Sequence, residues 1–129
     1  MLRFFFACLI LAVIIPVSSC SKSKDDAGPD LSLFEGRYVG KIGTGTVTPA
    51  GYFSLLLKSG GKLERLSEQG NILGEGTWEV SGEYFGAHYF NNEQTIEVTL
   101  NAKIDEAKTI GGGWINTGDK HGTFVLNKQ

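Results

Sequence analysis

Gly74-Glu75-Gly76-Thr77-Trp78-Glu79-Val80 shows the clearest strand pattern in the chain. Its small and apolar residues occupy every second position and alternate with two glutamates and a threonine. A period of two places successive side chains on opposite faces of a strand, so one face can be buried while the other meets solvent. The stretch therefore predicts a half-buried β-strand with Trp78 in the core.

Seven further stretches of similar character lie on both sides of this strand and are separated by short turn signals. We expect these strands at about 34–42, 52–58, 62–68, 84–90, 95–102, 110–117 and 121–127. Alternation places Phe34 and Tyr38 on the core face of the first of them, and Ile96, Val98 and Leu100 on one face of the fifth. Glycine, asparagine and aspartate occupy most of the connections, as tight turns require.

Eight short strands with short connections predict an all-β, antiparallel up-and-down meander. Eight is also the number at which a meander can close into a small β-barrel whose interior is filled by side chains or holds one small ligand. All 18 glycines follow Cys20, a composition that suits turns and close strand approaches rather than helices. Gly111-Gly112-Gly113 in particular predicts a bulge or a close approach. The alternatives are a two-layer β-sandwich, or fewer strands if 62–68 does not pair.

The N-terminus has the three parts of an export signal. Arg3 is its only charged residue, residues 4–17 are apolar, and the small Ser18 and Ser19 follow. The apolar part is shorter than the roughly 20 residues that a permanent membrane-spanning helix needs. We expect residues 1–19 to be a cleaved signal peptide.

Val17-Ser18-Ser19-Cys20 resembles the lipobox of bacterial lipoproteins. The resemblance implies a diacylglyceryl group on the Cys20 sulfur, cleavage before Cys20, and acylation of the new amino group by a chain such as palmitate. Each buried acyl CH₂ contributes about 0.8 kcal/mol, so two or more chains anchor a protein stably. The alternatives are an uncleaved anchor helix and an ordinary signal peptide with a chance cysteine.

The resemblance divides the chain into a signal peptide at 1–19, a lipidated Cys20 with a flexible tether at 20–32, and a β domain at 33–129. Ser21, in place of Asp, resembles lipoproteins sent to the outer membrane, and Lys24-Asp25-Asp26 resembles a signal for display at the cell surface. We expect a lipid anchor in the bacterial outer membrane, on its periplasmic or its cell-surface face.

Three segments of the β domain resemble the small lipocalin-like or streptavidin-like barrel lipoproteins of Gram-negative bacteria. They are Phe34-Glu35-Gly36-Arg37-Tyr38-Val39-Gly40, Gly76-Thr77-Trp78-Glu79-Val80 and Gly122-Thr123-Phe124-Val125-Leu126. The chain departs from true lipocalins because its tryptophan lies in the middle of the chain rather than on the first strand, and no biotin-binding set is present. The resemblance implies a one-domain barrel and leaves the ligand open.

Aromatic residues are the best candidates for a ligand site, because tyrosine and tryptophan combine an apolar face with a polar atom. We expect Tyr38, Trp78 and Trp114 to line a cavity if one exists, with simple core packing as the alternative. The predicted function is a non-catalytic, lipid-anchored binding module for a small or apolar ligand. The alternative is an inhibitor or accessory subunit of an envelope complex that binds through loops such as 43–51 or 116–122.

Other functional classes find little support. His88 and His121 are far apart and lack neighbouring ligands at metal-site spacing, and no Gly-x-Ser-x-Gly motif is present. Glu75, paired with Glu79 or Glu97, alternates with apolar residues and should face solvent. The formal net charge is −2 and no basic cluster exists, which disfavours nucleic acid. We therefore expect no enzyme activity, metal ion, cofactor or nucleic-acid partner.

Overall fold

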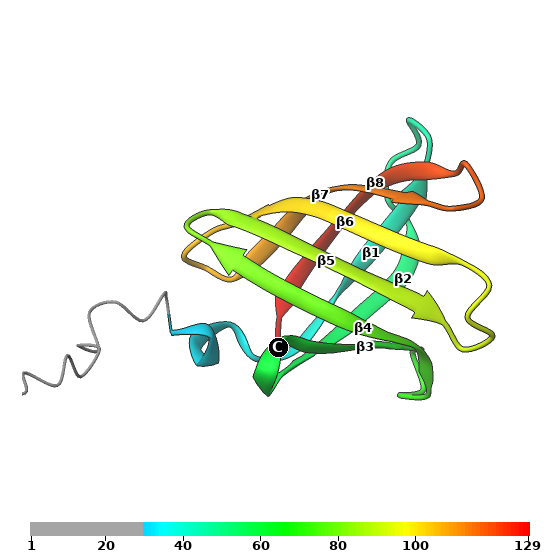
Figure 1. The fold of residues 1–129 in the computed structure, drawn as a ribbon. Helices are drawn as coiled ribbons and strands as arrows, with labels where there is room; N and C mark the ends of the chain where they lie inside the picture. Colours follow the sequence, from blue (N-terminus) through cyan, green and yellow to red (C-terminus); the bar gives the residue numbers. More distant parts are fainter. Residues whose placement is uncertain (1–29) are drawn as a thin grey trace, which may run out of the picture.

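The computed structural model describes residues 30–129 of the 129-residue chain (Figure 1). The expected signal peptide, Cys20 and most of the expected tether lie outside the described residues. No helix among residues 30–129 is long and apolar enough to cross a membrane.

The described chain folds into one closed β-barrel of eight antiparallel strands, in which each strand pairs with its neighbours in sequence. The barrel closes because the first strand also pairs with the last, with Tyr38 opposite Lys128 and Thr44 opposite Gly122. The strands are β1 (Gly36–Thr44), β2 (Gly51–Lys58), β3 (Lys62–Leu66), β4 (Ile72–Ser81), β5 (Tyr84–Asn91), β6 (Glu97–Ile104), β7 (Thr109–Asn116) and β8 (His121–Lys128). This strand pairing confirms the predicted all-β meander and shows a closed barrel rather than the alternative two-layer sandwich.

The core fills the inside of the barrel with the inward residues of all eight strands. Trp78 is buried as its alternation predicts, and the Phe53 and Phe124 rings meet edge to face with their centroids 5.6 Å apart. Alternate residues of β4, such as Glu75 and Glu79, are exposed. Residues that alternate in the sequence thus point in turn into the barrel and to its outer surface.

Two inward glycines let neighbouring strands approach closely where the wall bends. A Cβ atom on Gly76 would lie 1.8 Å from the His88 carbonyl oxygen, and one on Gly112 would lie 2.3 Å from the Asn101 carbonyl oxygen. Neither position can hold a larger residue without moving the adjacent strand. The expected close approach at Gly111-Gly112-Gly113 is therefore present.

One end of the barrel, here called the plugged end, is covered by the 3-10 helix η2 (Leu31–Phe34). Leu31 and Phe34 pack against the core. The helix is held to the strands because the Tyr38 hydroxyl donates to the Phe34 carbonyl (2.8 Å) and Lys128 Nζ donates to the Leu33 carbonyl (3.1 Å). Both the entering chain and the C-terminus lie at this end (Figure 1).

Asp30 begins η2 as its N-cap. Its carboxylate accepts hydrogen bonds from the Ser32 hydroxyl (2.6 Å) and the Ser32 N–H (3.0 Å). These bonds favour the ionised carboxylate and lower the pKa of Asp30.

The opposite end, here called the loop end, carries four connections: β1–β2, β3–β4, β5–β6 and β7–β8 (Figure 1). The second short helix, η3 (Ser59–Gly61), joins β2 to β3 at the plugged end, so both 3-10 segments lie there. Main-chain hydrogen bonds link connections of the loop end to neighbouring strands, as between Gly45 N–H and the His121 carbonyl of β8 (2.8 Å).

The wall is shortest between β2 and β3. Their ladder has four residue pairs and ends at Leu55 opposite Arg65, whereas β4 and β5 form eight pairs. Residues 51–54 of β2 therefore have no partner in β3, and the seam between the two strands opens toward the loop end.

Every strand differs from its expected range by one or two residues at one or both ends, and three of these boundaries have a clear local cause. Phe34 belongs to η2 and not to the first strand. β3 ends at Leu66, because a register shift follows Arg65 and a turn at 67–71 begins directly afterwards. β6 begins at Glu97, because the Asn91 side-chain oxygen accepts the N–H groups of Thr95 and Ile96 and holds them in a turn. Ile96 is consequently exposed rather than buried with Val98 and Leu100.

Candidate functional site

Tyr38, Trp78 and Trp114 are all buried, and each polar atom is already hydrogen-bonded to a main-chain carbonyl. Tyr38 bonds to Phe34 as described above, Trp78 Nε1 donates to Lys58 (3.0 Å), and Trp114 Nε1 donates to Gly43 (2.9 Å). The rings therefore pack in the core and their polar atoms connect strands to neighbouring segments.

The three residues do not converge on one point. The carbonyls that bind Tyr38 and Trp78 lie toward the plugged end, whereas the one that binds Trp114 lies toward the loop end. With their polar atoms occupied, they offer a ligand mainly apolar ring surface. Ligand binding by these residues stays a prediction.

The inner wall near the loop end carries a charged side chain that we did not single out in the sequence. Arg65 lies at an inward position of β3, opposite Leu55 of β2 and Gly74 of β4. Its guanidinium carbon lies 5.3 Å from the centroid of the Phe53 ring and 5.8 Å from that of Tyr89. Arg65 Nη1 donates to the Tyr89 hydroxyl at 3.4 Å.

The hydrogen-bonding groups and the charge of Arg65 are only partly satisfied by the residues around it. Its Nε atom is buried and has no hydrogen-bond partner, and no carboxylate among residues 30–129 lies within ion-pair distance of its guanidinium. Burial raises the pKa of the Tyr89 hydroxyl, and the adjacent Arg65 charge partly offsets that rise. The loop end thus combines a cation, a protonated phenol and two aromatic faces.

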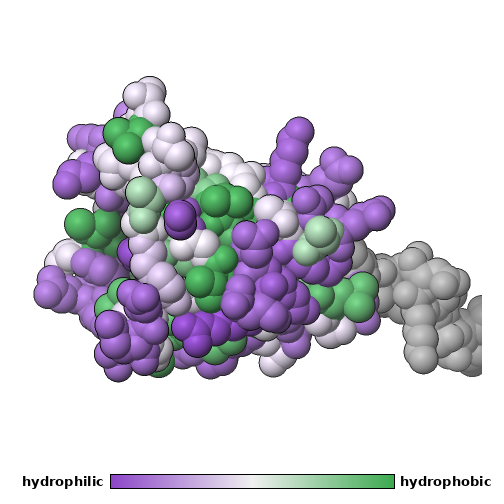
Figure 2. Space-filling view, turned by 180° about the vertical axis from the view of Figure 1, so that it is seen from behind, coloured by the Kyte–Doolittle hydropathy of each residue, from purple (hydrophilic) through white to green (hydrophobic). Residues whose placement is uncertain are grey.

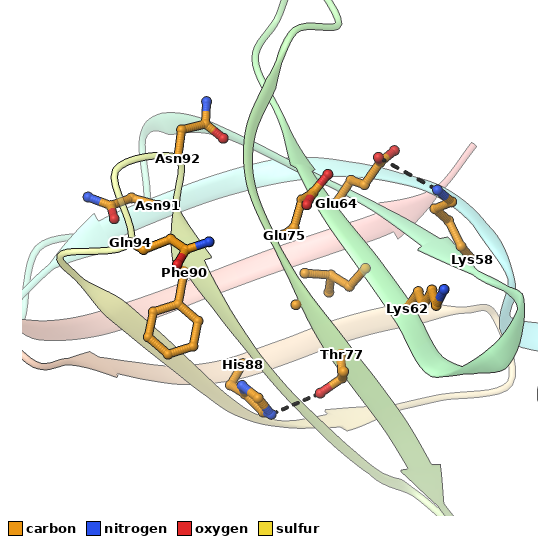
Figure 3. A pocket seen from close by; sticks show the side chains of 12 residues that line it. Lys58, Lys62, Glu64, Glu75, Thr77, His88, Phe90, Asn91, Asn92 and Gln94 are labelled. Atoms are coloured by element: carbon orange, nitrogen blue, oxygen red, sulfur yellow. Dashed lines mark hydrogen bonds and ion pairs between the residues drawn. The ribbon is translucent and has the colours of Figure 1, made fainter.

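A shallow hollow of about 630 Å³ lies on the outer wall over β3, β4 and β5. Figure 3 shows its lining, in which most of the labelled side chains are polar or charged and Phe90 is the labelled aromatic. Lys58 Nζ forms an ion pair with Glu64 (3.6 Å). The Asn91 and Asn92 side chains are engaged in hydrogen bonds to the turn and to the β4 main chain, so few of the polar groups are free.

A row of side chains on the outer surface begins at this hollow and runs across β4, β5 and β6. Thr77 Oγ1 and His88 Nε2 share a hydrogen bond of 2.9 Å, and His88 Nδ1 lies 3.5 Å from Glu97 Oε1 (Figure 3 shows the first two). Hydroxyl, imidazole and carboxylate follow the order of a nucleophile, a base and an orienting group. However, β4, β5 and β6 each pair on both sides, which engages their main-chain N–H groups in the sheet. An oxyanion hole needs such groups free.

The other polar residues considered in the sequence lie apart. His121 opens β8 and is exposed, whereas His88 lies on β5. Glu75 and Glu79 are exposed on β4. Among residues 30–129, no three His, Cys, Asp or Glu side chains come together in a way that could hold a metal ion. Cys20 lies outside the described residues.

A sequence signal for Arg65 did exist. Leu63 and Arg65 are two positions apart, so the alternation that buries Leu63 also points Arg65 inward. No local signal joins Thr77, His88 and Glu97, because they come from three strands and meet only through the registers of β4, β5 and β6.

The chain matches no family model, no curated protein and no solved structure.

Proposed function

We propose that this chain is a lipid-anchored lipoprotein of the bacterial outer membrane, cleaved before Cys20, whose barrel is a non-catalytic binding module for a small apolar ligand. The lipobox-like Val17-Ser18-Ser19-Cys20 and the short apolar stretch before it support the anchor. The proposal assigns the attachment to the acyl chains on Cys20.

The direction of the chain supports an outward-facing loop end. The tether enters the barrel at the plugged end, through η2. Asp30 lies ten positions after Cys20, which allows at most about 35 Å of extended chain. A lipid on Cys20 would hold the plugged end near the membrane, and the loop end would face away from it.

The observation that carries the binding proposal is the gathering of exposed apolar side chains at the loop end, here called the apolar rim. These side chains are 37–66% exposed, although single apolar residues elsewhere on the surface need no explanation. The rim consists of Val47, Ile72, Leu73, Ile96 and Ile115. Seen from behind, separate apolar side chains lie among hydrophilic ones at this end, and others lie in the middle of the same face (Figure 2).

One rim residue favours the second function, binding of an envelope protein. Val47 lies in the β1–β2 connection, inside the predicted loop 43–51, and is the most exposed large apolar side chain of the described residues, at 66%. A side chain that projects from a loop suits contact with a protein surface better than contact with a ligand held inside the mouth.

The anchor is tested by Cys20→Ser in the native host, with Cys8→Ser as a matched control because it changes a cysteine within the leader. Cys20→Ser should lose incorporation of labelled palmitate and should accumulate at the precursor mass, because lipidation precedes cleavage in lipoproteins. Cys8→Ser should behave as the wild type. Palmitate incorporation by the Cys20→Ser variant would overturn the proposed anchor.

The binding site is tested by titrating the full chain with 1-octanol and following tryptophan fluorescence. Leu73→Ser removes an apolar side chain from the rim, and Leu33→Ser removes a more exposed one from the plugged end. Leu73→Ser should weaken binding about threefold or more, since each buried CH₂ is worth about 0.8 kcal/mol, and Leu33→Ser should leave it unchanged. Equal effects of both variants would place the ligand elsewhere.

A further inference from the structure

We propose that the loop end binds the carboxylate of an amphipathic ligand, with Arg65 and Tyr89 holding the head and the apolar rim holding the tail. This inference rests on the proposed binding function and specifies the chemical class of its ligand.

Arg65 is a partly buried cation that lacks a counter-charge among residues 30–129. Its buried Nε–H has no acceptor, and its one side-chain hydrogen bond goes to a neutral phenol. Taking a guanidinium out of water is costly unless its N–H groups are paired. The Phe53 and Tyr89 rings offset part of that cost, but ring faces leave the N–H groups in the guanidinium plane free to bind an anion.

A carboxylate fits these groups better than a neutral head does. The planar guanidinium presents parallel N–H donors at the spacing of two carboxylate oxygens. The Tyr89 oxygen already accepts from Arg65, so its own proton is available for a second bond to the same anion. Burial raises the pKa of Tyr89 and keeps that proton in place at neutral pH.

The proposed approach of the head is from the loop end. Arg65 forms the last pair of the short β2–β3 ladder, and residues 51–54 of β2 beyond it have no partner in β3. The Arg65 Nε atom is buried, but the residue as a whole is partly exposed. Its partner in β4, Gly74, is buried against the Tyr89 ring and the Phe90 carbonyl, so the carboxylate would reach Arg65 from the side of the unpaired β2 residues.

The tail has an apolar surface at the same end of the barrel. Ile72 and Leu73 immediately precede Gly74 in β4, and both are exposed. Asn92 ties the β5–β6 turn to them, through its N–H to the Leu73 carbonyl (3.1 Å) and its side-chain amide to the Ile72 carbonyl (2.7 Å). Ile96 follows in that turn, so Ile72, Leu73 and Ile96 lie at the loop end of β4 and β5, with Leu73 on the outer face of the wall.

The test compares octanoate with 1-octanol, which has the same tail and an uncharged head. The full chain is held in nanodiscs of zwitterionic lipid, binding is followed by tryptophan fluorescence, and empty nanodiscs give the blank. Octanoate should bind about tenfold tighter than 1-octanol at neutral pH, a difference of about 1.4 kcal/mol that one charge-assisted pair can supply.

Arg65→Met keeps an unbranched side chain over the two rings and removes the charge, so octanoate should lose its advantage while 1-octanol still binds. Arg37→Met is the matched control, because Arg37 also donates to a tyrosine hydroxyl, that of Tyr52 (3.1 Å), but on the outer wall. Arg37→Met should bind both probes as the wild type does. Tyr89→Phe removes only a hydroxyl and should weaken octanoate alone, about threefold, which keeps the proposal testable if Arg65→Met does not fold.

The outcomes separate this inference from the function on which it rests. If both probes bind equally well to the wild type, the barrel binds apolar ligands but the carboxylate proposal is wrong, and Arg65 serves only to pack against the rings. Failure of both probes to bind would overturn the binding function as well. Equal losses in Arg65→Met and Arg37→Met would show that overall charge, and not the site, attracts octanoate.

Discussion

Gly76→Ala should destabilise the barrel strongly, because the new methyl group would collide with the main chain of β5. Its Cβ would lie 1.8 Å from the His88 carbonyl oxygen, 2.5 Å from Tyr89 Cα and 2.7 Å from the His88 carbonyl carbon. All three are backbone atoms, so no side-chain rotation can relieve the contact. Separation to an ordinary distance requires β5 to move by roughly 1.5 Å or more.

The expected loss of stability follows from the overpacking and from the ladder hydrogen bonds that must lengthen or break. Overpacking of a filled interior costs about 1–3 kcal/mol, and each ladder hydrogen bond that lengthens or breaks costs about 0.5–1.5 kcal/mol more. With one or two such bonds affected, we expect Gly76→Ala to lower the free energy of unfolding by about 3–5 kcal/mol. A domain of this size has about 5–15 kcal/mol in total.

Gly111→Ala is the matched control, because Gly111 lies in β7 and its Cβ would meet only the Phe124 carbonyl oxygen, at 3.9 Å. Because alanine restricts the conformations of the unfolded chain more than glycine does, Gly111→Ala should leave the free energy of unfolding unchanged or raise it by up to about 1 kcal/mol. Equilibrium unfolding in urea, followed by circular dichroism, measures both variants. If Gly76→Ala and Gly111→Ala agree to within about 0.5 kcal/mol, the close approach of β4 to β5 does not govern stability and the reasoning is refuted.

Two further predictions concern the aromatic residues expected to line a site. Burial raises the pKa of Tyr38 to about 12 from its ordinary 10.0. The folded state therefore holds this proton more tightly than the unfolded state, so stability should be intact below pH 10 and fall as the pH rises toward about 12. Unfolding measured across that window should show the loss, and Tyr38→Phe should show less of it; an identical profile would argue against the shift. Trp78→Phe removes the bond to the Lys58 carbonyl and should cost about 1–3 kcal/mol in urea unfolding. A cost below about 0.5 kcal/mol would mean that the indole N–H does not matter to the fold.

Much of the fold was predictable because neighbouring strands are also neighbours in sequence. The alternation at 74–80 predicted β4 and the burial of Trp78, and turn residues such as Asn91-Asn92 marked the hairpins. The boundaries were less accurate, since they depend on particular side-chain bonds. Ile96 is excluded from β6 by the Asn91 side chain, which no alternation rule detects.

The candidate site was predicted less well. Tyr38, Trp78 and Trp114 were chosen for their polar atoms, but the carbonyls that bind those atoms come from distant segments, such as Gly43 for Trp114. The inward position of Arg65 follows from its spacing to Leu63, yet its missing counter-charge depends on every residue around it. Burial and partner identity are properties of the closed barrel and not of a strand.

The sequence by itself determined the all-β class, the approximate positions of eight strands and the inward face of several of them, such as that of Trp78, because pleat and turn preferences act over a few residues. Only the tertiary structure decided that β1 pairs with β8, which closes the barrel and excludes a sandwich. It also decided that Arg65 reaches the loop end between two aromatic rings while Tyr38 is tied to the plugged end. These contacts join residues far apart in the chain, and they exist only once the registers of all eight strands are set together.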